Sequence, residues 1–418
     1  MRAASTTAGE KVIDQLEKSL GLPFGDDERA FLAEMSEWLD EHVPSERAPR
    51  RGSAERLPWL RRWQATLAEG RYVAPAWPSQ YGGRDATFLQ QMIYFAELDR
   101  RRLPTIPGRI GVSLLGPTLI EHGTDEQRER YLGRLRRGDD LWCQGFSEPG
   151  AGSDLASLRT RGVIDGDNLV INGQKIWTST AMNCDGVFAL VRTDPDAHKR
   201  KGISFVLVPL DAPGVDVRPI RQISGDAEFC EVFFNDVTVP LGNVIGSLNG
   251  GWDVTRTTLA NERAVLFLSR QLALSGTVDR LAGMARCVPH RAGTRADLPA
   301  VRERLAKAWI DVQLIRVNGM RNLAKVMDGA TPGPEGSMSK LFGQEAEQHL
   351  HELAVDLAGP VGLLAPGSDA AIDDGRWTTG WLRTRASTIG GGTSEIQRNI
   401  LAERVLGMPR DPWADEGV

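Results

Sequence analysis

The segment at residues 141–155, which reads LWCQGFSEPGAGSDL, constrains the fold of this 418-residue chain more than any other stretch. Aromatic and apolar residues typical of a β-strand run into Pro149, which cannot donate to a strand ladder and so ends the strand. Gly150 and Gly152 follow, and because glycine has no Cβ they let the backbone approach a flat or phosphorylated ligand closely. A plain Gly-rich turn would show the same residues. The segment alone therefore indicates a loop after a strand, with a ligand site and a simple turn as the two interpretations.

A second segment decides between these interpretations. Residues 169–180 read LVINGQKIWTST, which predicts a β-hairpin with Asn172 and Gly173 at its turn, followed by an indole and three hydroxyls. Together the two segments resemble the signature of the acyl-CoA dehydrogenase family, a Thr/Ser-Glu-Pro-x-Ala-Gly-Ser-Asp loop followed by an Asn-Gly-x-Lys-x-Trp-Ile-Thr/Ser hairpin. A third segment of the family, IGGGTSEIQR at residues 389–398, stands near the C-terminus, so the resemblance covers nearly the whole chain.

Hydrophobic periodicity divides the chain into three parts. Apolar residues recur at helical spacing in the first third, alternate with a period of two from Leu141, and return to helical spacing after Gly251. The resemblance implies the same order. We therefore expect an α+β fold with an N-terminal α-helical domain at 1–138, a middle antiparallel β domain at 139–250 and a C-terminal four-helix bundle at 251–418.

The predicted elements follow from these periods and from turn residues at their ends. Helices are predicted at residues 26–42, 57–69, 88–98, 253–285, 298–327, 337–357 and 394–406. A further helix is predicted to contain residues 129–135 and to be capped by Asp125 or Thr124. Strands are predicted at residues 141–146, 157–164, 169–177, 187–192, 204–209, 215–223 and 227–237. The segment 287–298, rich in Pro, Gly, Arg and His, predicts a mobile loop.

Composition argues against several classes of protein. The net charge is −5 with basic and acidic residues interspersed, so no basic stripe for nucleic acid or membrane is present. Four cysteines lack metal-ligand or CxxC spacing, which predicts reduced thiols and no metal site. No run has transmembrane length, no signal peptide is visible, and acidic residues within 1–18 argue against a transit peptide. We expect a cytoplasmic enzyme acting on a small molecule.

The resemblance implies a flavoenzyme that dehydrogenates an acyl thioester with FAD. Such a reaction needs a base for the α-proton, donors that hold the thioester oxygen, and the flavin N5 as acceptor of the β-hydride. The family's flavin contacts carry over onto residues of the first two segments, namely Gln144, Phe146, Ser147, Gly152, Ser153, Trp177, Thr178 and Ser179. Ser153 is also a candidate contact of the pantetheine chain of the substrate.

The Gly-rich segment before the last helix predicts a phosphate site. Residues 390–393 lead directly into a helix starting at Ser394, and a helix N-terminus with bare backbone amides attracts phosphate. In the family this arrangement holds the ADP half of FAD, and Thr393 and Glu395 fall on the contacting positions. No strand-Gly-x-Gly-x-x-Gly-helix unit of a dinucleotide fold is found in the sequence.

The catalytic base is predicted away from its commonest position. Many family members carry a glutamate where this chain has Gly391, which leaves only a backbone N–H for the thioester oxygen and room for a branched, bulky or long acyl group. A subset of the family supplies the base from a Leu-x-x-Glu-Arg pattern, present here from Leu259 to Arg263. Burial at the start of an apolar run would raise the pKa of Glu262 and make it a competent base. The alternative is a surface Glu262 paired with a cation; Arg263 is a candidate substrate contact.

Two departures from the family concern the partner subunit. The Arg-x-x-Phe-Gly motif for FAD across a subunit interface is not found, and Asp356 stands where a glutamine usually meets the pyrophosphate. We still expect a homodimer or homotetramer, because the resemblance implies an FAD site completed between subunits and because Trp377, Trp381 and Leu382 predict apolar surface near the C-terminal helices. The other expected partners are an acyl thioester of coenzyme A or acyl carrier protein and an electron-accepting flavoprotein. A non-catalytic flavin- or acyl-CoA-binding subunit of a heteromeric complex, and an oxidase or monooxygenase, are the alternatives.

Overall fold

The computed structural model describes residues 12–14, 16–18, 23–50, 52–291, 293–327, 333–334 and 336–409. Within its helices, the side chains of residues 260–272, 323 and 326–327 are not described. The chain forms two compact units, Met1–Glu262 and Arg263–Val418, and each is described by itself.

The first unit begins with helices that bury one apolar face each. They are α2 (Asp26–His42), α3 (Arg56–Glu69), α4 (Phe88–Arg100), α5 (Gly116–His122) and α6 (Asp125–Arg137). α2 has the predicted bounds and buries Phe31, Leu32, Met35 and Leu39. Thr124 caps α6, because its hydroxyl accepts from the Gln127 N–H at 3.3 Å. α5 starts at Gly116 and Pro117, because proline is tolerated at a helix start where its missing N–H would have no partner.

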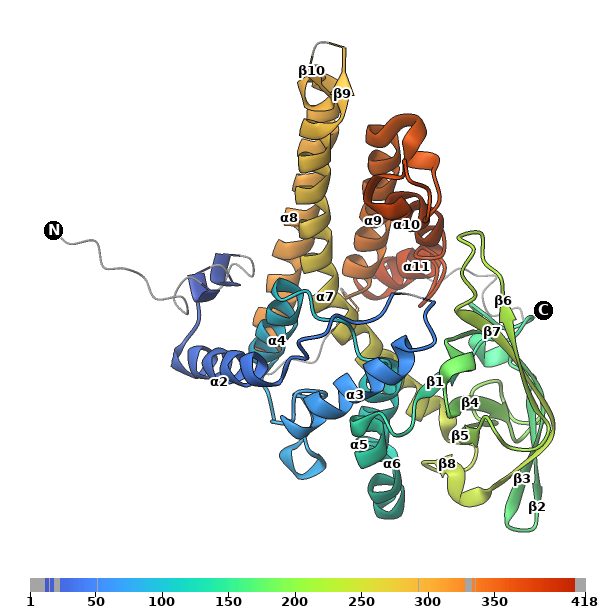
Figure 1. Ribbon diagram of the computed structural model, residues 1–418. Helices are drawn as coiled ribbons and strands as arrows, with labels where there is room; N and C mark the ends of the chain where they lie inside the picture. Colours follow the sequence, from blue (N-terminus) through green and yellow to red (C-terminus); the bar gives the residue numbers. More distant parts are fainter. Residues whose placement is uncertain are drawn as a thin grey trace. The chain divides into compact units, whose positions relative to one another are not determined.

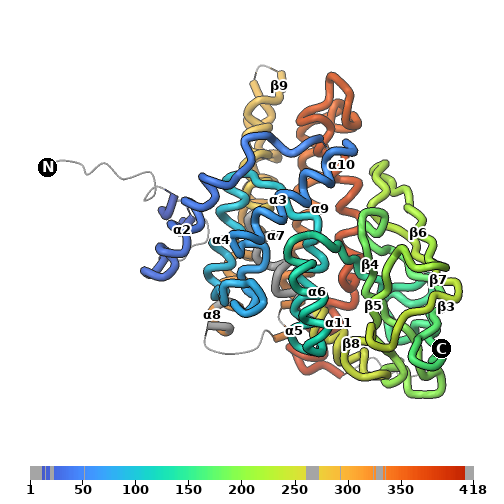
Figure 2. Tube along the Cα trace, turned by 60° about the horizontal axis from the view of Figure 1, so that its bottom comes forward, coloured from blue at the N-terminus to red at the C-terminus, as the bar shows by residue number. Residues whose placement is uncertain are grey.

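The rest of the first unit is one eight-stranded sheet, and Figures 1 and 2 both show its strands gathered at one end of the unit, away from α2 and α4. The strands are β1 (Trp142–Gly145), β2 (Arg161–Asp165), β3 (Asn168–Ser179), β4 (Gly186–Arg192), β5 (Ile203–Pro209), β6 (Val215–Ile220), β7 (Phe229–Pro240) and β8 (Val244–Ile245). Their order is β6-β7-β3-β2-β4-β5-β8, with β1 beside β4. Most pairings are antiparallel as predicted, while β1 and β2 each run parallel to β4.

The predicted hairpin turn at Asn172 and Gly173 is wrong. Both residues lie inside the twelve-residue strand β3, at a register shift opposite β7, and Gly173 has φ 150°. The turn lies earlier, between β2 and β3, where Gly166 has φ 57°. Asn-Gly is a strong turn signal, but in this chain β7 offers a continuous partner on both sides of the pair. Between the pairs Ile171–Val237 and Gly173–Phe234, β7 has one residue more than β3, so Asn172 and Gly173 lie in the strand opposite a bulge of β7.

The helices and the sheet of the first unit are joined by polar side chains. The amide of Gln127 on α6 donates to the carbonyls of Gly242 and Val244, at 2.8 and 2.9 Å, just before and within β8. The guanidinium of Arg61 on α3 lies 2.8 Å from Asp185, immediately before β4. These contacts fix α6 beside β8 and α3 beside the start of β4.

The second unit is built from α8 (Pro299–Met327), α9 (Gly336–Ala358), α10 (Arg376–Thr384) and α11 (Ser394–Arg404), together with the greater part of α7 (Gly251–Cys287), which begins in the first unit. Its core includes Leu281, Ala354 and Trp377. The expected exposure of Trp377 is wrong, because its indole is 2% exposed and donates to Asp373 at 2.8 Å.

The predicted mobile loop at 287–298 instead contains a short hairpin of β9 (Pro289–His290) and β10 (Gly293–Thr294) and a 3-10 turn at Arg295–Asp297. Among the described residues no helix is long and apolar enough to cross a membrane.

Candidate active site

A buried ion pair connects the first two signature segments. Lys175 on β3 is fully buried, and its Nζ lies 2.8 Å from Glu148 Oε1 and 3.2 Å from the carbonyl oxygen of Phe146. The other contacts of Glu148 are backbone N–H groups, those of Arg159 at 2.6 Å and Thr160 at 2.9 Å. Every polar atom of the pair is therefore engaged, as a buried pair requires.

The electrostatics of the pair follow from its burial. Burial alone would raise the pKa of Glu148, but the charge of Lys175 and the hydrogen bonds from Lys175, Thr160 and Arg159 hold that pKa below its usual value of 4.5. Burial lowers the pKa of Lys175 to about 8, against the opposing effect of Glu148. The carboxylate is thus ionised over the neutral range and fixes the loop as a charged acceptor.

The loop after β1 is compact and lies beside β3. Glu148 and Ala151 exchange two backbone hydrogen bonds of 3.0 Å around the exposed Pro149 and Gly150. The N–H of Ile176 donates to the carbonyl of Ser147 at 3.0 Å, next to Trp177. The structure therefore brings together the two segments that the sequence separates by about two dozen residues.

A β-bulge in β3 presents Trp177 to solvent. Lys175 pairs with Val232 and Thr178 with Cys230, so β3 has one extra residue between these pairs. The extra residue allows both Lys175 and Thr178 to face the interior, and Trp177 takes φ 61° with its side chain 56% exposed. Its indole makes an edge contact with Phe229, at 6.0 Å between ring centroids. A flat apolar surface is left open, as an isoalloxazine ring requires.

The predicted flavin residues differ in burial. Ser147 and Ser179 are half-buried, and Gly152 and Ser153 are exposed in the loop. Thr178 is fully buried on the interior face, where its hydroxyl has no hydrogen-bond partner among the described residues. Phe146 is also interior, with edge-to-face contacts to Phe188 and Phe205 at 5.8 and 5.9 Å. Gln144 is half-buried on β1.

The Gly-rich segment lies in the second unit and ends on α11. Gly391 and Gly392 have φ of 66° and 90°, a left-handed conformation that favours glycine. Thr393 caps α11 by accepting from the Ile396 N–H at 3.2 Å. Glu395 is exposed in the first turn, and hydrogen bonds from its own backbone N–H and from the Thr393 hydroxyl lower its pKa.

Buried polar atoms without partners surround this helix start. Ser394 Oγ, Gln397 Oε1 and Gln344 Oε1 belong to residues that are 6, 3 and 5% exposed, and none has a hydrogen-bond partner in the described part of the chain. Buried polar atoms are normally paired, so orphans at a helix N-terminus fit a site for a polar ligand.

The predicted base and its neighbour fall where only the backbone is described. Glu262 and Arg263 lie within α7, and the description of side chains in that helix stops at residue 259 and resumes at 273. Asp356 is paired with Arg304 on α8, at 2.8 Å. That the usual glutamine contact to the pyrophosphate is missing therefore stays a prediction.

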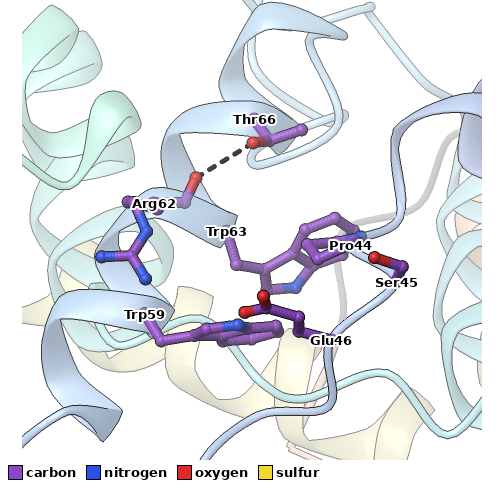
Figure 3. Close-up of a pocket in the computed structure, with 7 residues that line it drawn as sticks. All are labelled: Pro44, Ser45, Glu46, Trp59, Arg62, Trp63 and Thr66. Atoms are coloured by element: carbon purple, nitrogen blue, oxygen red, sulfur yellow. Dashed lines mark hydrogen bonds between the residues drawn. The ribbon is translucent and has the colours of Figure 1, made fainter.

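A small cavity in the first unit does not involve the predicted site residues. It measures about 200 Å³ and is lined by Pro44, Ser45, Glu46, Trp59, Arg62, Trp63 and Thr66. Figure 3 shows the Glu46 carboxylate beside the indoles of Trp59 and Trp63. Ligand pockets usually measure roughly 300–1,000 Å³, so this cavity is too small for a flavin.

Sequence reasoning missed some features that only proximity in space reveals. Cys143, Cys184 and Cys230, although distant in the sequence, belong to or pack against one apolar core of the sheet, and all are free thiols. The Glu148–Lys175 pair was also missed. Its signal was present in the sequence, as a lysine at an interior position of a predicted strand and an acid in the preceding loop.

Comparison with known proteins identifies the class. Residues 25–139, 143–237 and 249–406 match the N-terminal, middle and C-terminal domains of acyl-CoA dehydrogenases. The chain belongs to the acyl-CoA dehydrogenase family, and it is a flavin-dependent oxidoreductase that dehydrogenates acyl-CoA thioesters.

The individual relatives narrow the comparison. The chain is 40% identical to acyl-CoA dehydrogenase IpdE1 of Mycobacterium tuberculosis over 394 residues, covering 92% of this chain and 99% of that protein. Among solved structures, it resembles the Tcur3481-Tcur3483 steroid ACAD with a TM-score of 0.79 and 30% identity, covering 98% of this chain and 100% of that one. It also resembles the ChsE4-ChsE5 complex of Mycobacterium tuberculosis, with a TM-score of 0.76, 29% identity and the same coverage.

Proposed function

We propose that this protein binds FAD and dehydrogenates a bulky, polycyclic acyl-CoA between Cα and Cβ, with Glu262 as the base. The observation that carries the proposal is the conformation of Gly391, whose φ of 66° disfavours any residue with a Cβ. The backbone conformation of the loop thus favours glycine at the position where many family members carry the catalytic glutamate. Space beside the reacting carbons suits a large acyl group, and a solved relative is described as a steroid ACAD.

The residues described fit a flavin. The exposed face of Trp177 suits the isoalloxazine, and the start of α11, with the orphan atoms of Ser394 and Gln397, suits the ADP half of FAD. When bound, the flavin supplies the acceptor for the β-hydride. The other residues proposed for the cofactor site are Gln144, Phe146, Ser147, Gly152, Ser153, Thr178, Ser179, Thr393 and Glu395.

The protein's own residues would carry the remaining steps. Glu262 removes the α-proton, and the N–H of Gly391 donates to the thioester oxygen as negative charge develops there. Arg263 is proposed to contact the substrate, and Ser153 the pantetheine chain. The buried pair of Lys175 and Glu148 holds the loop that carries Ser153.

The experiment is an anaerobic panel of acyl-CoAs mixed with the purified protein. Bleaching of the flavin band and kcat/KM would be measured for a polycyclic steroid-type acyl-CoA, a long linear and a short linear one. The polycyclic acyl-CoA is expected to give the highest kcat/KM. A preference for the short linear acyl-CoA would refute the argument from Gly391, and FMN or no flavin after reconstitution would refute the cofactor assignment.

A second candidate is that the chain is one subunit of a complex of two different acyl-CoA dehydrogenase-like chains. The absence of the Arg-x-x-Phe-Gly motif and the ion pair of Asp356 with Arg304 support this, and one solved relative is described as a two-component complex. Sedimentation and FAD stoichiometry of the isolated chain test it. A fully active homo-oligomer with one FAD per chain would exclude the heteromeric assembly and support the homodimer or homotetramer expected from the sequence.

A further inference from the structure

One polar face of α9 holds the whole segment that precedes α11. Gln348 donates to the carbonyl of Thr384 at 2.8 Å and to the Thr388 hydroxyl at 3.1 Å. Glu347 accepts from the Ser387 hydroxyl at 3.3 Å. Further along the helix Glu352 pairs with Arg385, and about two turns before Glu347 the ammonium of Lys340 donates to the carbonyl of Gly392. Glu347 and Gln348 follow Lys340 by seven and eight residues, about two helical turns, so these three side chains lie on the same side of α9.

Lys340 acts where the Gly-rich segment meets α11. Its ammonium donates to the Gly392 carbonyl, while the Gln397 amide donates to the Gly391 carbonyl at 3.3 Å. Because a peptide unit is planar and trans, a carbonyl held in one direction turns the N–H of the next residue the opposite way. The N–H groups of Gly392 and Thr393 are therefore turned away from the groups that hold the carbonyls.

These N–H groups are available to a ligand. In the described part of the chain the backbone N–H groups of Gly392 and Thr393 make no hydrogen bond, and Ser394 Oγ beside them has no partner although its residue is 6% exposed. Successive backbone N–H groups at a helix N-terminus bind anionic groups such as phosphate. A lysine ammonium at the same place adds a full positive charge to the helix dipole.

We propose that Lys340 is a positioning residue for FAD, which orients the Gly392–Thr393 peptide so that its N–H meets the anionic ADP half of the cofactor. The inference rests on the proposed function and adds to it a residue on α9, outside the three signature segments. A glycine pair at left-handed φ is a flexible connection. A fixed side-chain donor is therefore needed to select one orientation before the ligand arrives.

The test measures binding of FAD and of FMN to apoprotein, for the wild type and for Lys340→Met, Lys340→Gln and Lys340→Arg. FMN lacks the ADP half. The Met variant is expected to bind FAD at least about tenfold more weakly, the size of one lost charge-assisted hydrogen bond, with FMN affinity unchanged. Arg is expected to restore FAD affinity and Gln to give an intermediate value. Lys307→Met, an exposed lysine on α8, is the matched control.

Each outcome has a separate meaning. Equal FAD affinity of wild type and Lys340→Met overturns the inference. Equal losses for FAD and FMN also overturn it, because they show a general structural role. Wild-type protein that binds no FAD contradicts the proposed function itself, before any variant is compared. A thermal melt of each variant identifies unfolding, and the Arg variant keeps the test valid where the Met variant fails to fold.

Discussion

Lys175 Nζ lies 2.8 Å from Glu148 Oε1, and this buried contact joins the loop after β1 to the bulged strand that carries Trp177. The loop and the strand that carry predicted flavin residues are thus held together by Lys175 and Glu148, to which no step of the reaction is assigned. A change in either is expected to disturb the cofactor site through its support.

Lys175→Met should be strongly destabilising. Removal of the cation leaves the Glu148 carboxylate buried and unpaired, which typically costs about 3–5 kcal/mol of unfolding free energy. Urea denaturation measures the loss. The control Lys199→Met breaks the exposed pair of Lys199 and Asp154, 3.1 Å apart, and should cost at most about 1 kcal/mol. Similar losses for both variants would contradict the role given to the buried pair.

The contribution of Glu148 to stability should depend on pH. Its folded-state pKa lies below the usual 4.5, so the unfolded chain takes up this proton first as the pH falls. The stabilisation is therefore complete above about pH 5 and is lost as the pH falls through the lower folded-state value. The difference in unfolding free energy between wild type and Glu148→Gln should shrink from pH 6 toward pH 3. A difference that stays constant would show that the carboxylate charge contributes nothing.

Glu262→Gln should keep FAD and bind ligand but lose on the order of 10² in turnover, the loss that removal of a general base commonly causes. The measurement is single-turnover bleaching of the flavin with a good substrate. Glu395→Gln is the comparison, because Glu395 is assigned to the cofactor and should weaken FAD instead. Bleaching of Glu262→Gln at the wild-type rate would place the base elsewhere.

Gly391→Ala should narrow the substrate range. A Cβ at φ 66° costs roughly 1–2 kcal/mol and reduces the space beside the acyl carbons. The expected result is a larger fall in kcat/KM for the polycyclic acyl-CoA than for a short linear one. Equal falls for both substrates would mean that the glycine serves the backbone conformation alone.

Trp177→Ala should weaken FAD binding by roughly tenfold while changing the thermal melting temperature little, because the indole is 56% exposed and contacts mainly Phe229. Trp309→Ala on α8 is the matched control, since its indole is also 56% exposed. If both variants bind FAD as tightly as the wild type, Trp177 is not part of the flavin surface.

Local sequence signals determined the bounds of several helices and the family of this protein. The apolar period and the acidic first turn set the bounds of α2, and Thr124 with Gln127 set the start of α6, because the groups that interact are a few residues apart. The motif residues likewise indicated the family and the flavin, since their chemistry is legible in short segments. The assignment of Glu262 as base is a prediction of the same kind, made from a five-residue pattern.

Tertiary structure decided what depends on distant partners. The long pairing of β3 with β7 kept Asn172 and Gly173 inside a strand, opposite a bulge of β7, and a bulge in β3 itself placed Thr178 inward and Trp177 outward. A strand's side chains change face when its register shifts by one residue, and register is set by the neighbouring strand. For the same reason the sequence could not show that Phe146 is buried, or that Lys340 on α9 holds the carbonyl of Gly392.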